Sequence, residues 1–283
     1  MSQLRRGIDG SAQPCGETPR GIATIDAAAV QGVKKPPRIL LIGGSDPSGG
    51  AGIQADIKTV TMLGGYAMTA ITTITVQNTL GVTAIEPLSA ELVTAQIDAC
   101  LADIGADAVK IGMLGSAAVA QAVADQLAGM TIPIVFDPVM AATNGGMLAD
   151  AATIAAFGRL MAIATLTTPN VTELAALGGD NALMARAISF LAKGGDAGDE
   201  IVTDRLVQSD LPDVAWQASR IHTSHNHGTG CTLASAIATH LGSGMTLEQA
   251  ITQARQFVRS ALENAPEFGQ GHGPMGHQAV SQM

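Results

Sequence analysis

The sequence predicts an α/β protein in which helices cover both faces of a mostly parallel sheet. From residue 38 onward, short and continuously apolar runs alternate with longer segments whose apolar residues return every three or four positions. Strands buried on both faces give unbroken apolar runs, and the crossover helices of a parallel sheet occupy the segments between them. The chain has 283 residues, 47% of them hydrophobic, which is enough for one large core.

The expected elements follow one another in a regular order. Residues 1–36 mix Arg, Gly, Ser, Pro and Gln without a period, so we expect a flexible N-terminal tail before a folded domain over 37–283. The strands are expected at 38–44, 66–76, 108–114, 132–140 and 165–170. The helices are expected at 50–64, 89–104, 116–129, 149–163, 171–178 and 182–192, with a last long one after Cys231.

Composition excludes several classes of function. Only 14% of the residues are charged, the net charge is −9 and 2% are aromatic, so the chain lacks the basic surface and stacking side chains of a nucleic-acid binder. No apolar run reaches the ~20 residues that span a bilayer. Cys15, Cys100 and Cys231 form no CxxC pair, which favours the reducing cytoplasm and argues against zinc.

Three histidines lie close together at His222, His225 and His227. Their spacing is not that of a zinc site, and they precede an irregular glycine turn. We therefore expect no metal ion bound directly by them.

The residues that end each predicted strand are polar or rich in glycine. In parallel sheets, ligands gather at the carboxyl ends of the strands, so these endings are the first candidates for a functional site. They are residues 43–46, 77–78, 112–113, 137–140 and 168–170.

The first ending, "GGSDPSGGAGIQAD", resembles two nucleotide-binding loops without matching either. Residues 50–55 fit G-x-G-x-x-A, but no acidic residue stands ~20 positions further on to hold a ribose. A Walker loop needs Gly-Lys-Ser/Thr, whereas the nearest lysine, Lys58, lies within the expected helix. Two interpretations remain open: a turn that lets a ligand approach the backbone, or tight packing of a strand against a helix.

The stretch "NHGTGCTLASAIATHL", residues 226–241, places Cys231 at the start of the last expected helix. The backbone N–H groups of residues 228–230 would have no partners inside that helix, and the helix dipole favours an anion there, phosphate above all. The same field should lower the pKa of the Cys231 thiol below about 8.5, which would make it a nucleophile or a base. A buried small residue without chemistry is the alternative.

Seven motifs in this order resemble one family: "GGSDPSGGAGIQADIKT", "VQNT", "KIGML", "DPVM", "TPNVTE", "HGTGCTLASAIA" and "GHGP". The resemblance covers residues 38–274 and is to the hydroxymethylpyrimidine and phosphomethylpyrimidine kinases of thiamine synthesis. It implies a ribokinase-like three-layer α/β/α kinase domain and a cytoplasmic homodimer. It also implies that ATP, with Mg²⁺, phosphorylates 4-amino-5-hydroxymethyl-2-methylpyrimidine and then its monophosphate.

The resemblance assigns roles to twelve residues. It makes Cys231 the base that takes the proton of the substrate hydroxyl. The family's anion site corresponds to Gly228, Thr229 and Gly230. The remaining positions are the pyrimidine-pocket residues Gly44, Asp56, Gln77, Met113 and Val139, with Asp56 near the hydroxyl, and the ATP- and Mg²⁺-binding residues Asn170, Glu173 and Lys193. Asn170 is equally suited to cap a helix.

One segment departs from the family pattern. Here "ISFLAKGGDAGDEIV" passes from the expected helix directly to "GDE", so one core strand is expected to be missing near residue 193, unless a segment such as 200–207 replaces it. Lys193 is then either in the nucleotide-contacting turn of the family or, as the pattern slightly favours, at the end of a helix capped by glycine. Because a missing strand exposes two sheet edges, an inactive pyrimidine-binding relative is one alternative to the kinase, and a pyridoxal kinase is the other.

Overall fold

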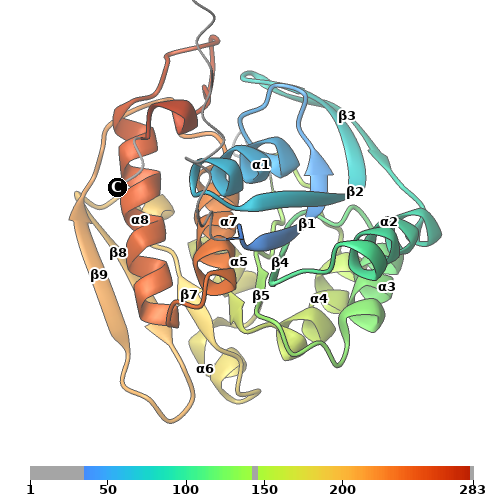
Figure 1. Ribbon diagram of the computed structural model, residues 1–283. Coiled ribbons are helices and arrows are strands. Elements are labelled where there is room, and N and C mark those ends of the chain that lie inside the picture. The colour runs from blue at the N-terminus through green and yellow to red at the C-terminus, as the bar shows by residue number, and fades with distance from the viewer. Residues whose placement is uncertain (1–34, 142–145, 281–283) are drawn as a thin grey trace, which may run out of the picture. The chain divides into compact units, whose positions relative to one another are not determined.

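A nine-stranded sheet forms the middle layer of the protein in a computed structural model, which describes residues 35–141 and 146–280. The strand order is β3-β2-β1-β4-β5-β6-β7-β8-β9 (Figure 1). The bounds are β1 Arg38–Ser45, β2 Tyr66–Asn78, β3 Gly81–Pro87, β4 Ala108–Ile111, β5 Ile134–Phe136, β6 Leu166–Thr167, β7 Phe190–Ala192, β8 Ile201–Val207 and β9 Val214–Ser219. Pairing is parallel from β2 to β7, and antiparallel for β2–β3, β7–β8 and β8–β9.

Helices cover both faces of this sheet, as predicted. Helices α1, α7 and α8 lie on one face, and α2, α3 and α4 lie on the other (Figure 1). The bounds are α1 Gly52–Met62, α2 Ala90–Asp103, α3 Ala117–Leu127, α4 Ala151–Ile163, α5 Val171–Ala176, α6 Gly179–Met184, α7 Thr229–Gly242 and α8 Leu247–Glu263. The three-layer α/β/α class expected from the sequence is confirmed.

Alternation along the strands divides the core into two clusters. In β4, Val109 and Ile111 pack under α2 and α3, whereas Ala108 faces α7. Because side chains of a strand point to opposite faces in turn, Lys110 lies on the α7 face although only 1% of it is exposed. The inner strands therefore need apolar residues on both faces, which explains their continuous apolar runs.

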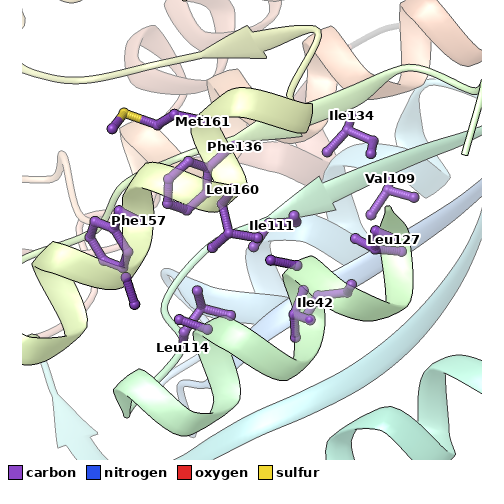
Figure 2. Packing of buried hydrophobic residues seen from close by; sticks show 14 of the residues in the cluster. Ile42, Val109, Ile111, Leu114, Leu127, Ile134, Phe136, Phe157, Leu160 and Met161 are labelled. Carbon is purple, nitrogen blue, oxygen red and sulfur yellow. The ribbon is translucent and has the colours of Figure 1, made fainter. Parts of the chain in front are cut away.

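The cluster under α2, α3 and α4 is closely packed and apolar (Figure 2). Phe136 of β5 meets Phe157 of α4 edge to face, with ring centroids 5.2 Å apart and an interplanar angle of 79°. This geometry suits the quadrupoles of the two rings and adds to the free energy gained by burying them. Leu160 and Met161 extend the same contact surface (Figure 2).

The strand expected to be missing is present, so this prediction is wrong. The helix expected at 182–192 ends as α6 at Met184, and β7 begins at Phe190. Ala187, in the left-handed region at φ 53°, turns the chain between them. β7 pairs in parallel with β6 and antiparallel with β8. A three-residue strand gives too short a period to separate it from a helix, which explains the error.

Two edge regions of the sheet were not predicted as strands. β3 is mostly exposed and pairs with the end of β2, so it lacks an apolar run. The segment named as a possible substitute, 200–207, forms β8, which adds to β7 rather than replacing it. β9 then closes this edge of the sheet, and its side chains alternate between half-buried and exposed.

The expected tail, residues 1–36, lies outside the described residues except for its last two. The folded unit begins at Pro36. Among the described residues, no helix is both long and apolar enough to cross a membrane.

Candidate active site

The carboxyl ends of the parallel strands meet in one cleft of about 1010 Å³, large enough for a nucleotide and a small ring together. Eleven of the twelve predicted site residues line it: Gly44, Gln77, Met113, Val139, Asn170, Glu173, Lys193, Gly228, Thr229, Gly230 and Cys231. These predicted residues therefore lie together at one cleft, although they come from seven separate segments of the chain.

The turn before α7 requires glycine by its geometry. Gly228, the N-cap residue, has φ 86°, and a Cβ there would lie 2.0 Å from the carbonyl oxygen of Gly50. The first intrahelical bond runs from the N–H of Thr232 to the carbonyl of Gly228. The N–H groups of Gly230 and Cys231 precede that bond, so this helix start can hold an anion.

Cys231, the third residue of α7, also faces the start of α1. The backbone N–H of Gly52, the first residue of α1, donates to its sulfur. Two helix N-termini therefore meet at the thiol. Burial nevertheless raises the pKa of the Cys231 thiol to about 11, although Lys110 and the Gly52 N–H act in the opposite direction. The prediction of a lowered thiol pKa is wrong because desolvation outweighs the helix-terminal field.

Asp56 is the one predicted site residue that does not line the cleft. It is fully buried on α1, where it accepts hydrogen bonds from Lys110 Nζ at 2.8 Å and Ser235 Oγ at 2.6 Å. Its carboxylate lies beneath the cleft and holds Lys110, which does line it. Asp56 therefore contacts Lys110 and Ser235 rather than the cleft, and its expected position near the substrate hydroxyl stays a prediction.

Lys193 lies at the carboxyl end of β7 and reaches into the cleft. Its Nζ donates to Asp137 Oδ1 at 2.8 Å and lies 3.9 Å from Glu173 Oε2. A Cβ on Gly230 would lie 3.2 Å from the same Nζ, so the ammonium sits beside the anion-binding turn. Burial opposes its charge, but Asp137 and Glu173 raise the pKa of Lys193 above its usual value. Lys193 is not the helix end that the sequence suggested.

Asn170 and Glu173 form a capping box at the start of α5. The Glu173 N–H donates to Asn170 Oδ1, and the Asn170 N–H donates to Glu173 Oε2, both at 2.8 Å. The cap role of Asn170 is confirmed. Burial raises the pKa of Glu173 to about 7, with nearby Asp137 contributing in the same direction. Its carboxyl thus titrates close to neutral pH.

One end of the cleft is formed by residues at the ends of β1, β2 and β4. Gly44 at the end of β1 lies close to Met113, since a Cβ there would come within 3.1 Å of the methionine sulfur. Thr72 Oγ1 fixes the Met113 backbone by donating to its carbonyl at 2.7 Å. The amide nitrogen of Gln77 is 3.4 Å from Thr75 Oγ1, and the Gln77 side chain lines the cleft with donor and acceptor atoms.

The other end of the cleft was missed by the sequence reading. It lies between β8, β9 and α8, and includes Asp204 and Arg255. Asp204 accepts from the N–H of Gly194 at 2.9 Å and from Arg255 Nε at 2.7 Å, so it fixes the turn after Lys193. The sequence analysis named 200–207 only as a possible substitute strand and did not predict β9, so it linked neither segment to a site.

Comparison with known proteins assigns this cleft to a family. A family model described as phosphomethylpyrimidine kinase matches residues 46–276. The chain belongs to the phosphomethylpyrimidine kinase family. It is 44% identical to the hydroxymethylpyrimidine/phosphomethylpyrimidine kinase of Rhizobium meliloti, over 84% of this chain and 96% of that protein. It is 37% identical to the Haemophilus influenzae enzyme of the same name, over 87% and 98%.

Solved structures agree with this membership of the phosphomethylpyrimidine kinase family. The phosphomethylpyrimidine kinase of Clostridium difficile matches with a TM-score of 0.68 and 32% identity, over 80% of this chain and 99% of that one. The ADP complex of Bacillus subtilis pyridoxal kinase matches with a TM-score of 0.77 and 29% identity, over 87% and 98%. The two kinds of kinase therefore share one architecture, and identity is somewhat higher with the former.

Lys110, Asp137 and Asp46 of this phosphomethylpyrimidine kinase family member also line the cleft. Asp46 and Asp137 lie in strand endings named as candidates, 43–46 and 137–140, but none of the three was assigned a role. Each stands within or just after an apolar run, as in "AVKIGML" and "VFDPVM". A charge inside a buried strand needs a partner, so a charged residue within an apolar run could have been used to predict a site.

The three clustered histidines separate in the structure. Asp46 Oδ2 is 2.9 Å from Nε2 of His227, which joins the first loop to the α7 turn. His222 lies 3.2 Å from Glu200 on the exposed surface. Within residues 35–141 and 146–280, no three His, Cys, Asp or Glu side chains are grouped as metal ligands.

Proposed function

We propose that the chain is an ATP-dependent kinase of thiamine biosynthesis that phosphorylates 4-amino-5-hydroxymethyl-2-methylpyrimidine and then its monophosphate. Membership of the family and the names of its relatives support this activity. Solved neighbours that carry ADP or AMP-PCP support ATP as the donor. The chain shares 44% identity with one such kinase, and its cleft is lined by the side chains that the reaction needs.

The observation that most supports this activity is the position of the turn before α7, between the two ends of the cleft. Gly228 lies against Gly50, beside the end of the cleft formed by β1 and β2, where the pyrimidine ring would bind. Gly230 lies against Lys193, beside the end formed by β8, β9 and α8. A phosphoryl group held at this turn would lie between an acceptor on one side and a nucleotide on the other. Such positioning is the main demand of phosphoryl transfer.

In the reaction, the hydroxymethyl oxygen bonds to the γ-phosphorus while the bond to the β,γ-bridging oxygen breaks, and ADP leaves. The N–H groups at the start of α7 and the Lys193 ammonium stabilise the charge on the transferring oxygens. The Cys231 sulfur, as thiolate, takes the hydroxyl proton. Because the transition state is loose, the hydroxyl proton leaves late, so the thiolate form of Cys231 can act as the base although burial raises the pKa of the thiol to about 11.

Mg²⁺ fits the donor set at the α5 start. Mg²⁺ in kinase sites is typically held by one or two carboxylates together with phosphate oxygens and water. Glu173 supplies one buried carboxylate, with the Asn170 side chain beside it. These residues would hold the ion jointly with the nucleotide, directly or through water. The ion would supply neutralisation of phosphate charge.

The alternative of an inactive relative has lost its basis, because the strand that motivated it is present as β7. A pyridoxal kinase remains the second candidate. Its support is the solved pyridoxal kinase of Staphylococcus aureus in complex with AMP-PCP and pyridoxal, which matches with a TM-score of 0.77 and 29% identity.

The deciding experiment measures ADP release by the purified protein with MgATP. The hydroxymethylpyrimidine should give turnover well above the control without acceptor, and pyridoxal should give less at equal concentration. No release above the control with either acceptor would refute the kinase. Faster turnover of pyridoxal would favour the second candidate. The homodimer implied by the resemblance stays a prediction, which the molar mass in solution would check.

A further inference from the structure

A buried group of three polar side chains lies under the cleft without a role in the reaction described above. Lys110 on β4 donates to Asp56 on α1 at 2.8 Å, and Ser235 on α7 donates to the other oxygen of Asp56 at 2.6 Å. None of the three is more than 1% exposed. Burying an ion pair this deeply has a large desolvation cost and is weak evidence for stability. A role in function would explain its presence.

The group is placed directly below Cys231. Ser235 follows Cys231 by four residues in α7, so both lie on the same helix face, one turn apart. Lys110 lies on the strand face that α7 covers, and both Lys110 and Cys231 line the cleft. Asp56 ties α7 to α1 through Ser235, and it holds Lys110 where its charge acts on the sulfur.

The charges that face the sulfur come from four elements. Lys110 favours the thiolate most, and Asp56 and Asp137 oppose it more weakly. Lys193, on the far side of the turn, is itself influenced by the charge of Cys231. Without Lys110, the sulfur would face two carboxylates in a buried site. Lys110 is thus the principal cation available to balance a negative sulfur.

We propose that Lys110, held by Asp56, is the counter-ion of the Cys231 thiolate and so sets how readily this sulfur accepts a proton. Lys110 is a positioning residue that acts through Cys231, not a catalytic residue. The proposal extends the proposed function, in which Cys231 takes the substrate proton. The reactivity of the sulfur can be measured without substrate, so failure of one proposal is distinguishable from failure of the other.

The test is the rate at which iodoacetamide alkylates Cys231 in the protein without nucleotide, followed by peptide-resolved mass spectrometry over about pH 7.5–9.5. Lys110→Met alone would leave Asp56 charged, buried and unpaired, and is expected to fold poorly. The informative variant is therefore Lys110→Met with Asp56→Asn. Because Lys110 acts on the sulfur more strongly than Asp56, this double variant should react about three- to tenfold more slowly at each pH.

Two single variants make the result specific. Lys110→Arg keeps the charge and should stay within about twofold of the wild-type rate, since the rate follows the thiolate fraction. Lys35→Met removes an exposed lysine before β1 and should change nothing. Alkylation of Cys100 in the same digest corrects for reagent and unfolding. A double variant that reacts as fast as wild type, or faster, would overturn the proposal.

Discussion

The two faces of the sheet bury different kinds of side chain, although the same alternation along each strand supplies both. On the face under α2, α3 and α4, the central strands β4 and β5 place only apolar side chains, Val109, Ile111, Ile134 and Phe136, up to their carboxyl ends. On the face under α1 and α7, the apolar positions of β4 and β5 are followed two residues later by a charge, so Ala108 precedes Lys110 and Val135 precedes Asp137.

The difference shows how a catalytic site can grow out of a core without a special segment. The period of two that points Ala108 and Val135 at α7 also points Lys110 and Asp137 there. Each buried charge then needs a partner, which Asp56 and Lys193 provide. The apolar face should therefore carry stability, and the charged face should carry activity at some cost in stability.

The largest effect is expected from Cys231→Ala on the charged face. The variant should lower kcat by about 10²–10⁴-fold, the usual contribution of a general base, while KM for both substrates changes little. The thermal midpoint should stay near that of the wild type, because the thiol is small and lies in the cleft lining. Steady-state ADP release and a melting curve measure both. Cys100→Ala is the matched control, and a kcat equal to wild type in Cys231→Ala would remove its proposed role.

Phe157→Ala on the apolar face should do the reverse. Loss of a fully buried ring that packs on Phe136 should reduce the free energy of unfolding by about 3–5 kcal/mol, through lost transfer energy and the cavity left behind. The kcat per folded molecule should be unchanged. Phe268→Ala, at a position 65% exposed, is the control and should cost well under half as much in chemical denaturation. Equal costs would contradict the assignment of stability to this face.

The sequence predicted this contrast only in part. The apolar runs were long enough to predict β1, β2, β4 and β5, and the glycine turn with Cys231 marked the anion site because its residue types are specific to that geometry. The short β7 and the edge strands β3 and β9 were missed, since three residues or a half-exposed edge leave no clear period, and β8 was named only as a possible substitute at 200–207.

The electrostatics were the least predictable part of the site. The helix start at Cys231 suggested a lowered thiol pKa, but the shift depends on burial and on partners brought from β4 and α1. Such partners are far apart in the sequence, as Lys110 and Ser235 are. A local sequence pattern predicts the electrostatic effect of one helix terminus. It does not predict the desolvation that outweighs this effect.

Glu173→Gln tests how much stability the protein loses by burying a charge on the charged face. Burial raises the carboxyl pKa from 4.5 to about 7, so between these values the folded protein holds a proton that the unfolded chain has lost. Stability therefore falls as pH rises through this window. The glutamine cannot ionise and still completes the capping box. At about pH 8 the variant should be more stable by about 1–3 kcal/mol, and near pH 4.5 the two should be alike.

Melting curves across that pH range, with exposed Glu86→Gln as control, check the difference. The same variant should bind MgATP more weakly, because the carboxylate that would hold Mg²⁺ is gone. In the wild type, KM for MgATP should fall as pH rises through about 7, and in the variant it should not. A variant less stable than wild type at about pH 8 would show that the Glu173 charge is stabilised by its neighbours rather than tolerated.

The smallest effect is expected from Arg159→Ala, which removes an ion pair with Asp125 at the outer surface of α4 and α3. The two side chains are 55% and 65% exposed, so the pair should contribute only about 0–1 kcal/mol. Its counterpart is Arg255→Met beside Asp204, whose side chains are 16% and 9% exposed. Breaking that pair leaves a carboxylate nearly buried and should cost several times more. Urea unfolding of both variants compares them directly. If both variants lose the same free energy of unfolding, burial does not make the charges of the cleft face more costly. The stability of the apolar cluster would then not be needed to offset them.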